Sequence, residues 1–236
     1  MARRAKTRRA GCIACTALAP AIAAIEAVVL QFRLQTMKIR AATKADHDAI
    51  WNIFREVVAA SDTYALDPTI SREDALAYWF APDTHTYVAE LDQQSVGEAV
   101  GFPGSAPPPQ AANRQDQCVA GTYILRPNQA SGGAHVANAA FMVAASARGQ
   151  GVGRAMAEHC LSEARRLGFR AIQFNFVVST NIPAIRLWQE LGFKIVGTLP
   201  GAFRHPEKGY VDVYVMYRSL LKGSRVRRAR RSRPTS

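Results

Sequence analysis

The chain has 236 residues, 48% of them hydrophobic, and a formal net charge of +12. This length and hydrophobic content fit one domain with appendages, and they exclude a chain too polar to bury a core. Four cysteines in so long a chain exclude a disulfide framework as the basis of the fold.

The positive charge lies at the two ends of the chain. Residues 1–36 carry six Lys/Arg and one Glu, residues 222–236 carry seven Lys/Arg and no acid, and residues 37–221 carry 17 of each. We therefore expect one neutral folded domain at 37–221. The tail at 222–236 predicts disorder and non-specific binding of polyanions, but without aromatic residues it predicts no specific nucleic-acid or membrane partner.

The N-terminal stretch is basic at residues 3–9 and uncharged at 10–25, which resembles a signal peptide and is too short to span a bilayer. A targeting segment and an N-terminal extension outside the fold are both open readings. We favour the extension, because Met37 begins a clean first strand. Cys12 and Cys15 form a lone C-x-x-C, which predicts neither a zinc site nor a redox pair.

The first half of the domain shows alternating strand and helix patterns. Residues 37–40 predict a strand, and residues 44–60 predict a helix capped by Thr43. A loop at 61–70 follows, in which Tyr64 is a candidate substrate contact. A second helix at 72–80, a strand at 86–92, a proline-rich excursion at 97–117 and a strand at 118–125 complete this half.

The second half contains two strands that are apolar on both faces. Residues 135–143 predict a central strand with Asn138 buried and hydrogen-bonded. Residues 170–178 predict a neighbouring strand, with Ile172, Phe174 and Phe176 on one face and Gln173 and Asn175 on the other.

The C-terminal part of the domain predicts two helices and two strands. The helices are 152–167 and a helix capped by Asn181, and the strands are 194–198 and 210–217. A Pro/Gly loop between these strands is expected to carry Arg204 and His205 near an acceptor site.

A glycine-rich turn joins the strand 135–143 to the helix 152–167. Such a turn brings the backbone and the unpaired N–H groups of a helix start close to an anion, so it predicts a phosphate site. Arg154 stands where a dinucleotide fingerprint needs its third glycine, and the P-loop lysine is absent.

The residues of this turn, Arg148, Gly151 and Gly153, resemble the pyrophosphate loop of the GNAT superfamily of N-acetyltransferases. The run from Asn181 to Phe193 resembles the second signature of the same family, Asn-x-x-Ala-x-x-Leu-Tyr/Trp-x-x-Leu-Gly-Phe. The resemblance implies the α/β GNAT fold. That fold has a central mixed, mostly antiparallel sheet of about seven strands, splayed at a cofactor cleft and flanked by about four helices.

The resemblance also implies acetyl-CoA as co-substrate, without a metal. Val143 would donate its N–H to the thioester carbonyl, where negative charge develops. The residues that would hold acetyl-CoA are Met142, Val143, Arg148, Gly149, Gln150, Gly151, Val152, Gly153, Arg154 and Asn181.

The acceptor half departs from the family pattern. Many family members use a tyrosine as proton donor where this chain has Trp188. The nearer resemblance is to the proline-analogue N-acetyltransferases of the yeast type. It implies that Asn138 binds the substrate carboxylate, that Asn175 holds the amine or a water that deprotonates it, and that Asn181 contacts coenzyme A.

These residues predict a transferase that moves an acetyl group from acetyl-CoA to the amine of a small amino acid or imino acid. The reaction would be direct attack in a ternary complex. The open alternatives are acetylation of a protein N-terminus or lysine, and a non-catalytic CoA-binding or nucleic-acid-associated protein. A homodimer and a cytoplasmic location are expected from the family and from the cytosolic co-substrate.

Overall fold

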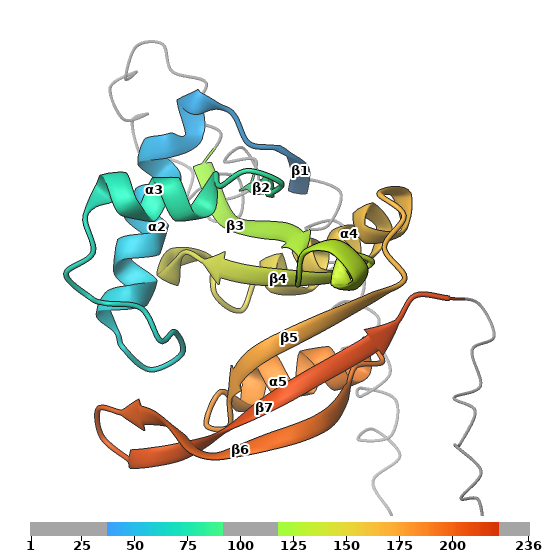
Figure 1. The fold of residues 1–236 in the computed structure, drawn as a ribbon. Coiled ribbons are helices and arrows are strands. Elements are labelled where there is room, and N and C mark those ends of the chain that lie inside the picture. The colour runs from blue at the N-terminus through green and yellow to red at the C-terminus, as the bar shows by residue number, and fades with distance from the viewer. Residues whose placement is uncertain (1–36, 92–117, 222–236) are drawn as a thin grey trace, which may run out of the picture.

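The computed structural model describes residues 37–91 and 118–221, with one mixed sheet at the centre (Figure 1). Seven strands lie in the order β1, β2, β3, β4, β5, β7, β6, and every neighbouring pair is antiparallel except β4 and β5. The predictions for 1–36, 97–117 and 222–236 fall outside the described residues. The strands are β1 (Met37–Ala41), β2 (His85–Leu91), β3 (Cys118–Pro127), β4 (Val136–Val143), β5 (Ala171–Val178), β6 (Lys194–His205) and β7 (Gly209–Ser219).

Within the described residues four α-helices cover the two faces of the sheet, which confirms the predicted fold. One face packs on α2 (His47–Ala59) and α3 (Arg72–Trp79), and the other packs on α4 (Val152–Arg166) and α5 (Ile182–Glu190). Short 3-10 turns lie at Lys44–Asp46, Ser131–Gly133 and Ala145–Ala147.

The alternation of side chains along β3 and β4 assigns them to these two faces. Ile124 and Met142 are buried in a cluster with the apolar side chains of α2 and α3. Tyr123, Leu125 and Ala139 are buried in a second cluster with α4. From Gly121 onward, even-numbered residues of β3 and β4 therefore face α2 and α3, and odd-numbered residues face α4 and α5.

The predicted start of α3 is confirmed, because the Ser71 hydroxyl accepts from the N–H of Asp74. The predicted start of the first helix at residue 44 is wrong, since Thr43 and Asp46 form a capping box around the 3-10 turn Lys44–Asp46 and α2 begins after it, at His47. The apolar side chains of α2, which include Ile50 and Phe54, are buried.

The parallel pairing of β4 and β5 is short. It joins Val136 to Ala171 and Ala137 to Ile172, and no later residue of β4 has a partner on β5. The two strands separate from Asn138 onward, as Figure 1 shows between the upper and lower parts of the sheet. The splayed sheet predicted from the family resemblance is thus present.

A β-bulge changes the predicted faces of β5. Its pairing with β7 passes from Phe174 opposite Met216 to Val177 opposite Tyr214, so one extra residue lies on β5. As a result Val177 takes the buried position, and Phe176 is 39% exposed. The expectation that Phe176 shares the buried face of Phe174 is therefore wrong.

The predicted Pro/Gly loop at 199–209 is also wrong, because β6 continues to His205. A register shift between Leu199 and Phe203 accommodates Pro200 and Gly201, and the Gly201 N–H donates to the Asp212 carboxylate at 3.0 Å. Since β6 is the edge strand, a proline there loses no hydrogen bond to a second neighbour.

Two smaller features complete the fold. Cys118 is exposed, whereas Cys160 is buried. None of the described helices combines the length and the apolar character that crossing a membrane requires.

One ion pair fixes the start of α2 to the edge of the sheet. The Asp46 carboxylate accepts two hydrogen bonds from the Arg40 guanidinium, at 2.7 and 2.8 Å, and two more from Thr43. The guanidinium and these donors lower the pKa of Asp46 to about 2. Because the unfolded chain then binds the proton more tightly, the stabilisation is complete above an ordinary aspartate pKa of about 4.

We predict that Asp46→Asn lowers the free energy of unfolding at neutral pH by about 2 kcal/mol. The difference from the wild type should shrink as the pH falls from about 4 towards about 2. Urea unfolding at a series of pH values measures this. Asp48→Asn is the matched control, because Asp48 pairs with Arg72 at the surface and should change stability little. Equal effects of the two substitutions at every pH would contradict the assignment.

Candidate active site

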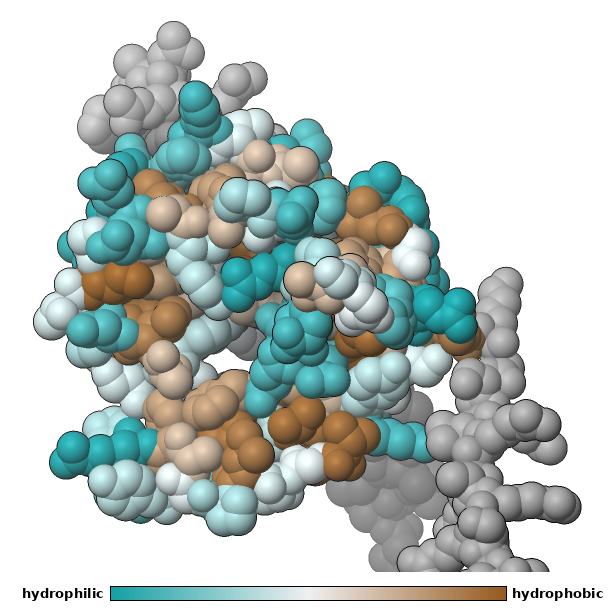
Figure 2. Space-filling model, viewed as in Figure 1, coloured by the Kyte–Doolittle hydropathy of each residue, from teal (hydrophilic) through white to brown (hydrophobic). Residues whose placement is uncertain are grey.

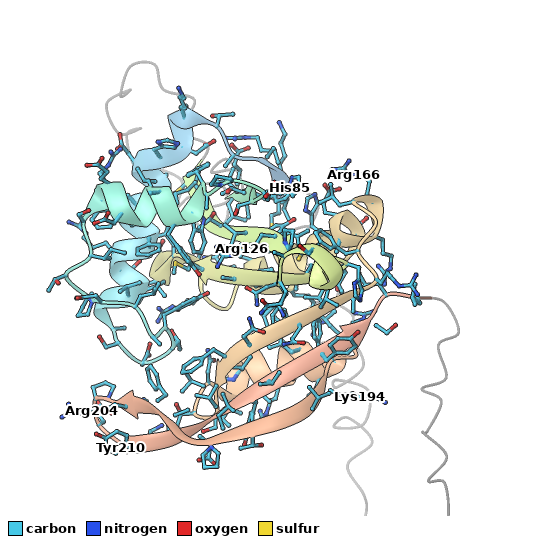
Figure 3. All side chains as sticks on the ribbon, in the orientation of Figure 1. His85, Arg126, Arg166, Lys194, Arg204 and Tyr210 are labelled. Atoms are coloured by element: carbon cyan, nitrogen blue, oxygen red, sulfur yellow. The ribbon has the colours of Figure 1, made fainter. Side chains whose placement is uncertain are left out.

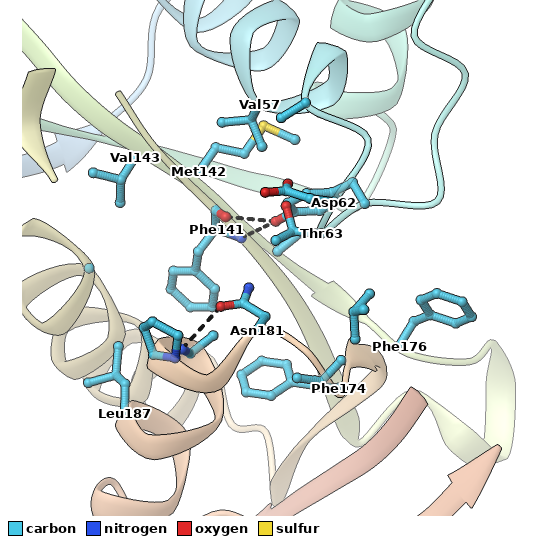
Figure 4. Close-up of a pocket in the computed structure, with 18 of the residues that line it drawn as sticks. Val57, Asp62, Thr63, Phe141, Met142, Val143, Phe174, Phe176, Asn181 and Leu187 are labelled. Carbon is cyan, nitrogen blue, oxygen red and sulfur yellow. Dashed lines mark hydrogen bonds between the residues drawn. The ribbon is translucent and has the colours of Figure 1, made fainter. Parts of the chain in front are cut away.

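A cleft of about 1120 Å³ lies where β4 and β5 separate. It is bounded by the free edge of β4, by β5, by the loop after α2, by the start of α5 and by the turn 206–208. Figure 2 shows the molecule hollowed on this face, between the helix-covered part above and β5 to β7 below. Figure 4 shows the side chains that converge there.

The register of β4 determines which backbone groups face the cleft. Asn128 donates to the Val136 carbonyl and Ala144 donates to the Ala120 carbonyl, so the even-numbered residues of β4 exchange hydrogen bonds with β3. The odd-numbered residues therefore direct their N–H and C=O groups towards the position that β5 leaves. Phe141 and Val143 are the two such residues nearest the end of the strand.

The hydroxyl of Tyr64 is hydrogen-bonded to both backbone polar groups of Phe141. It donates to the Phe141 carbonyl at 2.7 Å and accepts from the Phe141 N–H at 3.0 Å, as the dashed lines in Figure 4 show. Burial raises the pKa of this phenol, which keeps it protonated and able to donate. Tyr64 thus lies in the cleft, as the sequence suggested, and the next backbone donor along the edge is the Val143 N–H.

The glycine-rich turn follows directly after this edge. Gly149 and Gly151 have φ of +74° and +82°, in the left-handed region that favours glycine, and a Cβ at Gly149 would meet no atom within 4 Å. The space beside the turn is therefore open. Gly153 lies against Val143, since a Cβ on it would stand 3.9 Å from Val143 Cγ2.

Helix α4 begins at this turn without a side-chain cap or an acidic residue in its first turn. Its first backbone bond runs from the Ala155 N–H to the Gly151 carbonyl, so the N–H groups of Val152, Gly153 and Arg154 have no partner within the helix. Three backbone donors at the positive end of a helix dipole can bind phosphate oxygens.

The charged and polar side chains of the turn differ in their availability. Arg148 is exposed beside the cleft. Arg154 is ion-paired with Glu190 and lies 3.9 Å from Glu158, so its backbone N–H is better placed for an anion than its side chain. Gln150 donates its side-chain amide to the Ser146 carbonyl at 2.9 Å.

Two other predicted cofactor residues have structural partners. Met142 is 1% exposed against α2, and as an even-numbered residue its backbone pairs with β3. The Asn181 side chain accepts from the Ala184 N–H at 3.3 Å, which confirms it as the cap of α5 (Figure 4).

The predicted catalytic asparagines lie on either side of the separation. Asn138 is half-buried rather than buried, and its side-chain amide donates to the Gln173 carbonyl at 2.9 Å. It therefore joins β4 to β5 just past their last pair. Asn175 is exposed, accepts from the Gln173 side chain at 2.8 Å and donates to the Asn128 side chain at 2.6 Å.

Aromatic rings form the apolar wall of the cleft. Trp188 is 8% exposed and packs against Phe141 and Phe174, with ring centroids 5.0 and 4.6 Å apart. An indole offers only a weakly acidic N–H, so Trp188 shapes the cleft rather than supplying a proton.

The histidine expected near the acceptor site has a structural role. His205 is buried, and its Nδ1 accepts from the N–H groups of Glu207 and Lys208 at 3.1 and 3.3 Å. These bonds close the turn between β6 and β7 and occupy the Nδ1 lone pair. Arg204 and Tyr210 lie at the tip of this hairpin (Figure 3).

Sequence reasoning missed one cleft residue, Arg126, and one residue that is hydrogen-bonded to Asn175, which is Asn128. Arg126 lies near the end of β3 and donates to the Tyr78 hydroxyl at 3.1 Å, with its guanidinium 4.8 Å above the Tyr78 ring. Asn128 follows the same strand. Both lie just past the predicted end of the strand at 125, where a run of mixed polar residues reads as a turn. Among the described residues, no group of three His, Cys, Asp or Glu could hold a metal.

The comparisons with known proteins agree with this geometry. A solved N-acetyltransferase of this type from Kribbella flavida is 43% identical, with a TM-score of 0.66, and the match covers 78% of this chain and 98% of that one. The N-acetyltransferase aca1 of Schizosaccharomyces pombe is 40% identical over 96 residues, and Protein SPT10 of Saccharomyces cerevisiae is 33% identical over 88. Those matches span 40% and 37% of this chain, and only 46% and 14% of the two relatives.

The family comparison covers the site itself. The Acetyltransferase (GNAT) family matches residues 48–193, which include β4, the glycine turn, α4 and α5. That match confirms the resemblance of the two signatures and the expected class of enzyme, a transferase. The chain therefore belongs to the Acetyltransferase (GNAT) family.

Proposed function

We propose that the domain transfers an acetyl group from acetyl-CoA to the amine of a small amino acid or imino acid, by direct attack in a ternary complex. The observation that carries the proposal is the edge of β4 that no described strand pairs with beyond Ala137, which ends at Val143 directly beside the start of α4. In support, a related phosphinothricin acetyltransferase from Sinorhizobium meliloti, 20% identical with a TM-score of 0.62, was solved with acetyl-CoA.

The residues present fit acetyl-CoA. The open space at Gly149 and the N–H groups of residues 152–154 suit a pyrophosphate, with Arg148 adding positive charge nearby. The thioester supplies an activated acyl group when acetyl-CoA is bound. Val143 then offers its N–H to the carbonyl oxygen, where negative charge develops.

Amide side chains gather on the acceptor side, next to the point where β4 and β5 separate. Asn138, Gln173 and Asn175 lie on the face of the sheet that α2 and α3 cover, opposite to the buried Phe174. Because an amide has no useful basicity, Asn175 would hold the amine or a water that accepts its proton. Trp188 supplies no acid, so we infer that water protonates the leaving thiolate.

The function is tested by following thiol release from acetyl-CoA with proline, azetidine-2-carboxylate, polyamines and aminoglycosides. Release with the first two supports the proposal. Release with none of them would overturn catalysis and favour a CoA-binding protein.

Two glycines with similar backbone geometry, one in the turn and one after α4, allow a matched test of acetyl-CoA binding. We predict that Gly149→Ala raises KM for acetyl-CoA roughly tenfold, because the turn is strained and the methyl enters the open phosphate space. Gly168→Ala is the control. Gly168 has φ of +84° and equally open surroundings, but it ends α4 far along the chain from the turn. If the two variants share one KM for acetyl-CoA, the turn does not bind the pyrophosphate.

On the acceptor side we predict an effect on kcat rather than on KM for acetyl-CoA. Asn175→Ala should lower kcat by roughly 10- to 100-fold, the cost of one lost positioning hydrogen bond, with KM for acetyl-CoA unchanged. Steady-state thiol release measures both constants. Asn52→Ala, an exposed change on α2, is the control. An unaltered kcat for Asn175→Ala would remove Asn175 from the reaction.

A further inference from the structure

We infer that Arg126 binds the carboxylate of the acceptor and so restricts the enzyme to amino or imino acids over amines that lack an acidic group. The inference rests on the proposed function, whose acceptor it specifies. It follows from the position of Arg126, from its charge and from the groups beside it.

The position of Arg126 follows from the register of the sheet. Arg126 on β3 is opposite Asn138 on β4, and both have even numbers, so both side chains lie on the face covered by α2 and α3. Asn138 in turn reaches Gln173 of β5 across the separation. Arg126 therefore borders the cleft at the point where the two strands part, next to the amides of the acceptor side.

Arg126 has no carboxylate partner among the residues that the structure describes. Four other arginines form the ion pairs seen among the described residues, and Arg126 takes part in none of them. Asp62 and Glu207 also line the cleft, and neither is paired with Arg126. A half-buried guanidinium without a counter-ion inside a substrate cleft is a site for an anionic ligand.

The orientation of the guanidinium is held by α3. Tyr78 places its ring below the group at 4.8 Å and accepts one hydrogen bond at 3.1 Å. A guanidinium has five N–H donors, so a single bond leaves enough for a carboxylate held by two parallel hydrogen bonds. Figure 3 shows Arg126 between α3 and β4, away from the exposed arginine at the hairpin tip.

The neighbours of Arg126 suit the rest of an amino acid. Asn138 uses one N–H on Gln173 and keeps a second N–H for the same carboxylate. One carbon separates the carboxylate of an α-amino or α-imino acid from its nitrogen. A carboxylate at Arg126 and Asn138 thus directs the amine towards Asn175, on the same face of the neighbouring strand.

The test compares proline with prolinamide, which keeps the ring and the amine and lacks the carboxylate. Thiol release gives kcat and KM for both acceptors with the wild type, Arg126→Met, Arg126→Lys and the exposed control Arg55→Met. For each variant we take the ratio of kcat/KM for proline to kcat/KM for prolinamide. Comparing this ratio between variants removes the effect of the different amine reactivities of the two acceptors. Calorimetry of proline binding to the CoA-loaded protein is the second readout.

Arg126→Met should raise KM for proline roughly 10- to 100-fold and leave KM for prolinamide and for acetyl-CoA unchanged. Arg126→Lys should restore part of the loss, because it keeps the charge without the bidentate geometry. Tyr78→Phe, which removes one hydrogen bond and keeps the ring, should have a smaller effect. Arg55→Met should behave as the wild type.

Different results would contradict the carboxylate site at Arg126 and the proposed acetyl transfer. Acetylation of proline with an acceptor ratio that Arg126→Met does not change would overturn the role of Arg126 and leave the proposed function intact. Proline binding lost in Arg126→Met without thiol release from any acceptor would keep the carboxylate site and overturn the proposed reaction. Neither binding nor release of any kind would overturn both.

Discussion

The parallel pairing of β4 and β5 ends after Ala137 and Ile172, and the cleft exists because it ends there. Among the described strands, β4 has one neighbour instead of two from Asn138 onward, so half of its backbone groups there lack a strand partner. Such groups are costly to bury and must find other partners. The Tyr64 hydroxyl bonds to the backbone N–H and C=O of Phe141, and the N–H of Val143 lies at the end of the edge, beside the glycine turn.

The two faces of the sheet carry different parts of the site. The odd-numbered residues of β4 continue into the core under α4, where the helix start offers backbone donors for a phosphate. The even-numbered face carries Asn138 and Arg126, near Asn175 of β5. Under the proposed function, co-substrate and acceptor would approach the separation from opposite faces and meet at Val143, the arrangement that direct attack requires. The homodimer that the family resemblance implies is a proposal separate from this arrangement of co-substrate and acceptor.

The sequence predicted those parts of the site that local chemistry determines. The glycine-rich turn and the Asn181 cap are set by neighbours within one or two turns of chain. The rest depends on distant contacts. Tyr64 meets a residue 77 positions away, the bulge in β5 arises only against β7, and Pro200 reads as a loop until β6 is known to be an edge. Arg126 was missed because its partner Tyr78 comes from another element.

The central claim is that the free edge of β4 receives acetyl-CoA, with the Val143 N–H as its last donor. Amide hydrogen exchange followed by NMR, with and without acetyl-CoA, tests it residue by residue. The Val143 amide should exchange quickly in the free protein and become protected on binding, whereas Met142, already paired with β3, should change little. Protection at residues 152–154 without any change at Val143 would show that acetyl-CoA binds by its phosphates alone, and it would contradict the account.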